Sequence, residues 1–155
     1  MLTTADLMKF CDQGYSRTAK PWSLGEDTMA TDAILLIRVP RLADVSENPE
    51  APKTDGMWPK TQAEQRYPVP MVPLHECEKC GGDGQIDGGV CAWCEGKGKY
   101  AYEDDREEIA GCLFGHKSLS LLNTLPNCEI SPTGPRTPAW IRFGGGDGLL
   151  MPRRR

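Results

Sequence analysis

The sequence lacks any long apolar run. No unbroken one is longer than Ala33–Ile37, which is far shorter than the roughly 20 residues that a membrane-spanning helix needs. The segment Met1–Phe10 shows no basic stretch followed by an apolar one, so we expect no secretory signal peptide. Together these absences exclude an apolar membrane-spanning helix and predict a soluble protein of the cytoplasm.

The chain is also short of apolar and cationic residues. Apolar residues make up 39% and aromatic residues 7% of its 155 residues, which is enough for one modest core and not for two large ones. The 18 Lys and Arg residues against 22 Asp and Glu residues give a formal net charge of −4. This balance excludes a cationic field over the whole protein of the kind that wraps nucleic acid.

Groups for acid–base and nucleophilic catalysis are equally scarce. The chain has two histidines, His75 and His116, and the pattern places both in loops with no recognisable nucleophile beside them. The glycines of Gly144–Gly148 precede no Lys-Ser or Lys-Thr pair and open no helix, so they indicate a hairpin turn rather than a phosphate-binding loop. We therefore expect that the protein is not an enzyme.

Cysteine and glycine, in contrast, are abundant and locally ordered. Four of the seven cysteines and seven of the 17 glycines lie within residues 77–98. Residues 77–84 read CEKCGGDG and residues 91–98 read CAWCEGKG, so both fit the pattern C-x2-C-x-G-x-G. In this pattern a tight turn aims both sulfurs to one side. The glycines permit the positive φ that lets backbone N–H groups face the thiolates.

Two such pairs make a closed tetrahedral site of four thiolates, which is typical of structural zinc. Iron in a rubredoxin-like site is the weaker interpretation. We expect one Zn²⁺ per chain, with the ligands Cys77, Cys80, Cys91 and Cys94. Redox-active C-x-x-C pairs and ordinary buried cysteines are the alternatives. A redox motif normally follows a strand and opens a helix, whereas glycines follow both pairs here.

The repeated motif resembles the cysteine-rich domain of DnaJ-type co-chaperones, and residues 77–98 carry the resemblance. Those chaperones have four such repeats and two zinc ions, so the two repeats of this chain imply one zinc ion. They also have a J-domain with a His-Pro-Asp loop, and neither histidine here precedes Pro-Asp. The resemblance implies the zinc knuckle and not the stimulation of a partner's ATPase. Two-repeat forms occur in small protein-binding proteins such as the anti-TRAP regulator.

A second resemblance surrounds the first. Met29–Leu36 is similar to the ATDG-x-L strand of bacterial replicative sliding clamps. Lys117–Leu125, followed by Glu129 and Ile130, is similar to their YL-x-x-x-L helix and the strand after it. Leu149–Arg153 is similar to their terminal V-x-MPMR strand. The pieces imply a body like one clamp domain, whereas a clamp chain has three. The overall pattern looks like small phage-encoded proteins, for which the host cytoplasm is the expected location.

Hydrophobic periodicity predicts an α+β fold, with a small helix-and-antiparallel-sheet body around the inserted knuckle. A helix is expected over Ala5–Gln13 after Thr3 or Thr4, and a second one after Ser118 as N-cap. Ile34–Val39 is the best strand, with alternate side chains on opposite faces.

The expected division of the chain has three parts. Residues 1–40 and 110–155 form the α+β body, and residues 75–100 form the zinc-binding knuckle. Between them, residues 41–74 are expected to be a Pro-rich arm or linker outside the packed core, since residues 40–73 hold seven of the 13 prolines.

Several further residues have a functional and a structural interpretation. His75 is either a replacement ligand or a loop histidine near a complete site, and Trp93 either contacts a partner or packs on the other knuckle repeat. The acidic run Asp104–Glu108 is a solvated charge run, unless it binds a hard cation or mimics phosphates. The tail Arg153–Arg155 is frayed unless it contacts phosphate. The cysteines outside the motif are expected to be core residues: Cys11, Cys112 and Cys128.

Three functional hypotheses follow. The first is a non-enzymatic zinc-binding interaction protein that binds and modulates a host protein machine of replication, transcription or defence. The second is an accessory protein that binds nucleic acid through a basic strip of Lys97, Lys99, Arg142 and Arg153–Arg155. The third is a thiol–disulfide oxidoreductase that uses the C-x-x-C pairs, which bound metal would exclude. A protein partner is therefore expected, and membrane binding is not.

Overall fold

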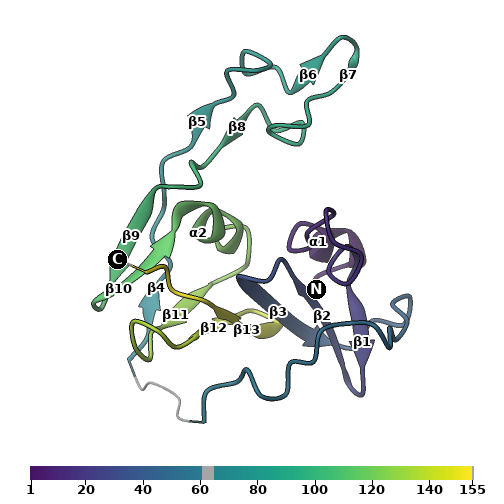
Figure 1. Ribbon diagram of the computed structural model, residues 1–155, viewed down its shortest axis with the longest axis vertical. Helices are drawn as coiled ribbons and strands as arrows, with labels where there is room; N and C mark the ends of the chain where they lie inside the picture. The colour runs from purple at the N-terminus through teal and green to yellow at the C-terminus, as the bar shows by residue number, and fades with distance from the viewer. Residues whose placement is uncertain (61–64, 155) are drawn as a thin grey trace.

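A seven-stranded sheet, antiparallel throughout, forms the centre of the computed structural model, which describes residues 1–60 and 65–154 (Figure 1). Across the sheet the strands are Trp22–Leu24 (β1), Asp27–Thr31 (β2), Leu35–Pro40 (β3), Gly146–Leu150 (β13), Ala139–Phe143 (β12), Glu129–Ser131 (β11) and Tyr67–Pro68 (β4). The central pair, β3 and β13, joins distant parts of the chain, with Leu36 opposite Leu149. The expected strand over residues 34–39 and the hairpin around Gly144–Gly148 are both present.

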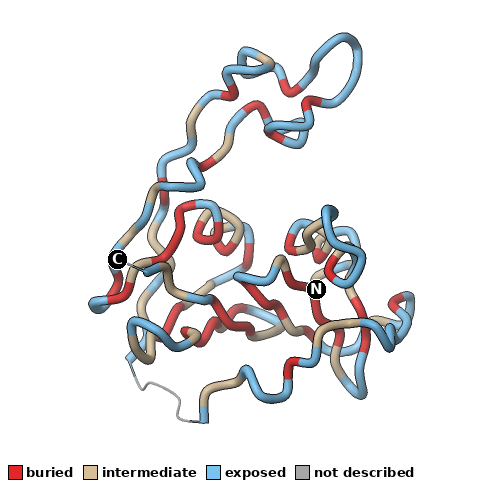
Figure 2. Tube along the Cα trace, viewed as in Figure 1, coloured by how far each residue is buried: buried red, intermediate tan, exposed pale blue. Residues whose placement is uncertain are grey.

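Alternate side chains of the strands point to opposite faces of the sheet, as the period of two requires. From β3, Leu35, Ile37 and Val39 enter the larger hydrophobic cluster, whereas Leu36 enters a separate, smaller one. The larger cluster lies beneath the two helices that the structure describes, Thr4–Met8 (α1) and His116–Leu122 (α2). Each helix contributes fully buried side chains, among them Leu7, Leu119 and Leu122. The core therefore belongs to the sheet and the helices, away from the knuckle (Figure 2).

Both helices differ from the sequence expectation, α1 at its end and α2 at its start. Helix α1 starts after Thr3, whose side chain and that of Asp6 form a capping box, but it ends at Met8 and not at Gln13. The backbone continues from there in tight turns. Helix α2 starts at His116 after an extended Gly115, so Ser118 lies inside the helix and does not cap it. The cause is a hairpin of Arg106–Ile109 (β9) and Cys112–Gly115 (β10), because β10 runs directly into α2.

The expectation that residues 41–74 stay outside the packed core is wrong. Val45 and Thr54 are buried, and Trp58 packs against the smaller cluster on the sheet face opposite the helices. That cluster consists of Trp22, Met29, Leu36, Trp140 and Leu149. Further along the segment, Val72 is buried in the larger cluster. Among the described residues of this segment the two-residue strand β4 is the only regular element, yet the prolines do not prevent packing, and an extended stretch covers the second face of the sheet.

Trp58 is the main contact of this covering segment. Its ring lies 5.3 Å from that of Trp140 and 3.8 Å from the guanidinium carbon of Arg38. Arg38 in turn forms a bidentate ion pair with Asp147, at 2.8 and 2.7 Å, across the central strand pair. The hydrogen bonds that Arg38 donates to Asp147 raise the pKa of the Arg38 guanidinium.

Replacing Trp58 by alanine is expected to loosen this segment from the sheet. The half-buried indole loses its contacts with Trp140 and Arg38, and the expected loss in the free energy of unfolding is about 2 kcal/mol. Thermal denaturation followed by circular dichroism measures it. Met57→Ala is the control, because Met57 is half exposed next to it in sequence. Equal effects of the two substitutions would mean that Trp58 does not hold the segment in place.

The cysteine-rich segment projects from the body at the top of Figure 1. The chain leaves the sheet after β4 and returns to it at β11. These two strands pair with each other. The projecting part contains four short strands: His75–Glu76 (β5), Gln85–Ile86 (β6), Gly89–Val90 (β7) and Lys99–Tyr100 (β8). Strand β5 pairs with β8, and β6 pairs with β7. In Figure 2 buried residues are few in this part of the chain.

Candidate metal centre

The four predicted ligands converge on one point inside the knuckle. Their sulfur atoms all lie within 4.8 Å of one another: Cys77, Cys80, Cys91 and Cys94. The Sγ atoms of Cys77 and Cys91 are 3.9 Å apart, and those of Cys80 and Cys94 are 3.7 Å apart. Four sulfurs around zinc at about 2.3 Å are about 3.8 Å apart in a tetrahedron. The spacing fits a four-thiolate metal site and is far too long for disulfide bonds, which are about 2.05 Å.

The two repeats have equivalent backbone contacts, related by 14 positions in the sequence. The N–H of Gly84 donates to the sulfur of Cys80 at 3.2 Å, and the N–H of Gly98 donates to that of Cys94 at 3.2 Å. These bonds confirm that the glycine turns direct backbone N–H groups at the thiolates. Such bonds stabilise the charged sulfurs and orient them toward a metal.

Reciprocal hydrogen bonds join the repeats to each other. The N–H of Cys77 donates to the carbonyl of Gly98 at 2.8 Å, and the N–H of Cys91 donates to that of Gly84 at 2.9 Å. Gly84 and Gly98 have φ values of +77° and +75°, and a Cβ on either would collide with a backbone carbonyl of the other repeat, at Gly96 or Gly82. These two positions therefore need glycine for both conformation and space. The sequence did not lead us to expect these bonds between the repeats, although the 14-residue spacing of the two motifs indicates that they are equivalent.

The sulfur cluster is shielded from solvent to different degrees. Cys77 and Cys91 are fully buried and Cys94 nearly so, while Cys80 is half-buried. Burial raises the pKa of the Cys77 thiol to about 11. In the metal-free chain this thiol is therefore protonated at neutral pH, and metal binding must release its proton. A thiol–disulfide nucleophile needs the opposite shift, toward the thiolate.

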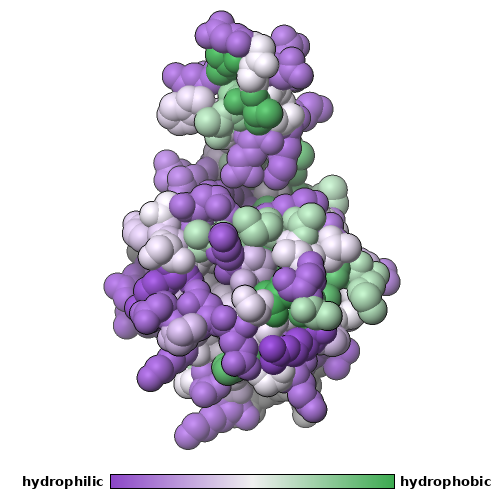
Figure 3. Space-filling view, turned by 90° about the vertical axis from the view of Figure 1, so that its right-hand side faces the viewer, coloured by the Kyte–Doolittle hydropathy of each residue, from purple (hydrophilic) through white to green (hydrophobic). Residues whose placement is uncertain are grey.

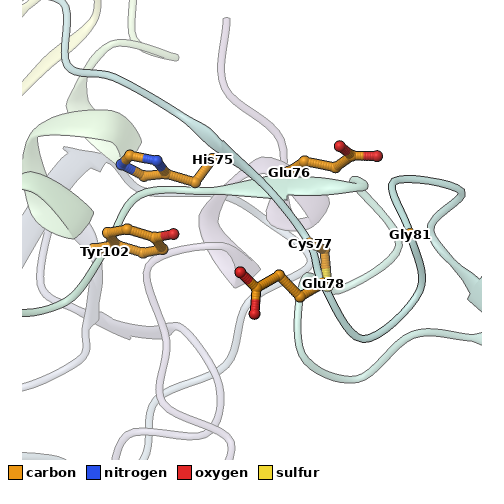
Figure 4. Close-up of a pocket in the computed structure, with 6 residues that line it drawn as sticks. All are labelled: His75, Glu76, Cys77, Glu78, Gly81 and Tyr102. Atoms are coloured by element: carbon orange, nitrogen blue, oxygen red, sulfur yellow. The ribbon is translucent and has the colours of Figure 1, made fainter.

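An aromatic stack forms one side of the base of the knuckle. The rings of His75 and Tyr102 are parallel within 3°, with centroids 3.7 Å apart, and Figure 4 shows them face to face. The two rings lie beside a hollow lined by His75, Glu76, Cys77, Glu78, Gly81 and Tyr102. His75 is not part of the sulfur cluster, in agreement with the interpretation that it is a residue near a complete site. The stack was not predicted, because no short-range pattern links residues 27 positions apart.

Two carboxylates of the acidic run Asp104–Glu108 contact the two histidines. A carboxylate oxygen of Glu107 lies 3.2 Å from Nε2 of His116, and one of Asp105 lies 3.8 Å from Nε2 of His75. Among the described residues the run forms no group of three or more carboxylates, thiols or imidazoles placed to hold a metal ion. It lies along the segment that connects the knuckle to the body.

The basic strip of the second hypothesis is not gathered in one place. Lys97 and Lys99 lie in the knuckle, whereas Arg142 lies in β12 of the sheet and donates to the Ser131 hydroxyl at 3.3 Å. Arg153 makes a backbone bridge to Leu113 at the edge of β10. Arg155 is outside the described residues, so its predicted role stays a prediction.

The remaining cysteines have the expected structural role. Cys112 is buried, and Cys11 and Cys128 pack against the larger cluster while half-buried. Burial raises the pKa of Cys11 to about 11 and that of Cys128 to about 12. Cys11 and Cys128 are therefore protonated, unreactive thiols at neutral pH. No helix in the described part of the chain is long and apolar enough to span a membrane.

Comparisons of the chain with protein-family models, with curated proteins and with solved structures find no match. The DnaJ-type, sliding-clamp and phage resemblances therefore rest on the sequence motifs, and a clamp-like body is not confirmed. The structure confirms coarser statements. The body is mostly antiparallel sheet with few helices, and four cysteines are close enough to hold a metal ion.

Proposed function

We propose that this is a non-enzymatic zinc-binding interaction protein whose metal-stabilised knuckle binds another protein. The observation that carries the proposal is the cluster of four sulfurs at the spacing of a tetrathiolate tetrahedron. Zinc fits this site best, because thiolates are soft ligands and the four sulfurs have the tetrahedral arrangement that zinc adopts. One ion per chain follows from one cluster among the described residues.

The position and surface of the knuckle support a binding role. It projects from the body, and Trp93 between the last two ligands has 69% of its surface exposed. The ammonium of Lys79 lies 5.0 Å from its ring. Exposed aromatic side chains are frequent anchors of protein interfaces, and a structural role for Trp93 would bury it. Trp93 therefore contacts the other repeat through Lys79, while its exposure leaves most of the side chain available to a partner.

The donor set also favours a structural metal over a catalytic one. Four thiolates fill a tetrahedral zinc site, so no position is left for an activated water molecule. Thiol–disulfide exchange, the third hypothesis, is disfavoured because thiolates that hold a metal ion cannot cycle between thiol and disulfide. Nucleic-acid binding ranks below protein binding because the basic residues are dispersed between the knuckle and the sheet.

The partner class follows from the sequence resemblance alone. A small phage-encoded protein of this type acts in the host cytoplasm, where thiols stay reduced, and binds a host machine of replication, transcription or defence. The clamp-like motifs of the body favour replication among these.

Affinity capture from a bacterial lysate tests the proposed function. The zinc-loaded full chain is expected to retain at least one protein that the Cys77→Ser/Cys80→Ser variant loses by tenfold or more. Trp93→Lys separates contact from folding, since Lys79 occupies the equivalent position of the first repeat. This variant should keep its zinc and still lose the partner. If the double serine variant keeps every partner, the knuckle is not the binding element.

A further inference from the structure

Charge is distributed unevenly over the molecule. Residues 75–108, which we call the acidic module, contain ten Asp and Glu residues and four Lys and Arg residues, a formal charge of −6. The rest of the chain contains 12 acidic and 14 basic residues, a charge of +2, which restores the total of −4. Zinc with four thiolates adds −2, so the loaded module carries −8. Nearly a quarter of the chain thus holds more than its entire negative charge.

The outer part of the acidic module is apolar as well. Ile86, Val90 and Trp93, which we call the tip, have exposed fractions of 40%, 74% and 69%. Figure 3 shows green apolar atoms among purple polar ones on the projecting end of the molecule. An acidic surface is normally well hydrated, so three large exposed apolar side chains within eight residues are unusual there.

The acidic module is held in a defined position. The β5–β8 pair and the parallel rings of His75 and Tyr102 brace its base, and the backbone bridge from Arg153 to Leu113 fixes the β9–β10 hairpin to the body. Within the knuckle the two repeats interlock through Cys77 and Cys91. A surface that is ordered before binding loses little conformational freedom on association, so its tip is suited to entering a preformed pocket.

We propose that the acidic module docks onto a cationic protein surface and inserts its apolar tip into a pocket there. The proposal rests on the proposed function, because it names the chemistry of the partner that the knuckle binds. Charge complementarity selects this partner. A negative charge of this size repels nucleic acid and anionic membranes, and the body of a second copy carries a charge of +2 only.

The repeat offers matched substitutions for a test. Asp83 and Lys97 occupy equivalent exposed positions of the two repeats, so each residue type is already accepted by the same turn. Asp83→Lys makes the module less negative by two charges, and Lys97→Asp makes it more negative by two. Zinc content verifies that both variants are folded.

The experiment uses a nuclease-treated bacterial lysate divided on a cation-exchange column into retained and unretained proteins. The immobilised zinc-loaded chain should capture its partner from the retained fraction. Capture should fall at least fivefold with Asp83→Lys, rise with Lys97→Asp, and weaken between 50 and 500 mM NaCl. Val90→Thr, which keeps the shape and adds a hydroxyl, should weaken it severalfold.

The outcomes separate this inference from the proposed function. Zinc-dependent capture from the unretained fraction, or equal capture by the two charge variants, would overturn the cationic partner and leave the proposed function standing. Equal capture by Val90→Thr would overturn the insertion of the tip. Capture that disappears on nuclease treatment would show a nucleic-acid bridge and overturn the docking. No zinc-dependent capture from either fraction would overturn the proposed function itself.

Discussion

Removal of the metal is expected to unfold residues 77–98 and leave the sheet folded. The buried side chains of the knuckle are the cysteines themselves, with Tyr100 packed against them, so this part of the chain has no apolar core of its own. Zinc binding in comparable small sites contributes about 10–16 kcal/mol, and this is folding free energy where the apo site is unfolded. The strands β3, β12 and β13 have a separate hydrophobic core that metal removal does not touch.

Amide hydrogen exchange with and without a strong chelator measures this effect. Protection of residues 77–98 should be lost by several orders of magnitude, while that of β3 and β13 stays. Metal analysis should give one zinc ion per chain for the wild type and for Cys11→Ser, whose sulfur lies outside the cluster. Cys80→Ser should lose the ion. Persistent protection of the knuckle after chelation would show that the metal is not what folds it.

Alanine at Gly84 or Gly98 is expected to weaken metal binding more than any other single change of a non-ligand residue in the knuckle. Each position combines a left-handed φ, which costs about 1–2 kcal/mol for a residue with a Cβ, with a collision against the carbonyl of the opposite repeat. Relief of the collision would break the reciprocal bonds to Cys77 and Cys91.

Competition with a chromophoric chelator measures the zinc affinity of these variants, and a loss of more than 100-fold is expected. Gly88→Ala is the matched control, because Gly88 has a φ of +79° but no atom within 4 Å of the new Cβ. It isolates the cost of the backbone conformation. Equal losses for Gly84→Ala and Gly88→Ala would mean that the two repeats do not interlock as described.

The metal site could be predicted from the sequence because its determinants are local. Each C-x2-C pair forms one turn, the glycines mark the backbone conformation, and the repeat requires that the two turns face each other. The strand of residues 35–40 was equally predictable, since Leu35, Ile37 and Val39 alternate with Leu36 and Arg38 between two faces.

The rest depends on contacts between residues distant in sequence, for which a single sequence gives no signal. The aromatic and aliphatic residues that pack residues 41–60 onto the sheet are scattered among prolines, and the cluster that they join draws on β1, β2, β3, β12 and β13. The β9–β10 hairpin was not predicted, because Arg106, Glu107 and Glu108 have the composition of a solvent-exposed charged segment. Its Ile109 nevertheless reaches the larger cluster.

The pairing of β3 with β13 sets an order for the folding of the molecule. Arg38 and Asp147 are 109 residues apart, so the closure of the sheet must overcome a large loop entropy before its contacts stabilise it. The knuckle closes over only 22 residues and is completed by an ion from solution. We therefore expect the metal site to form early and independently. Part of the long chain segment between β4 and β11 would then already be compact before the centre of the sheet assembles.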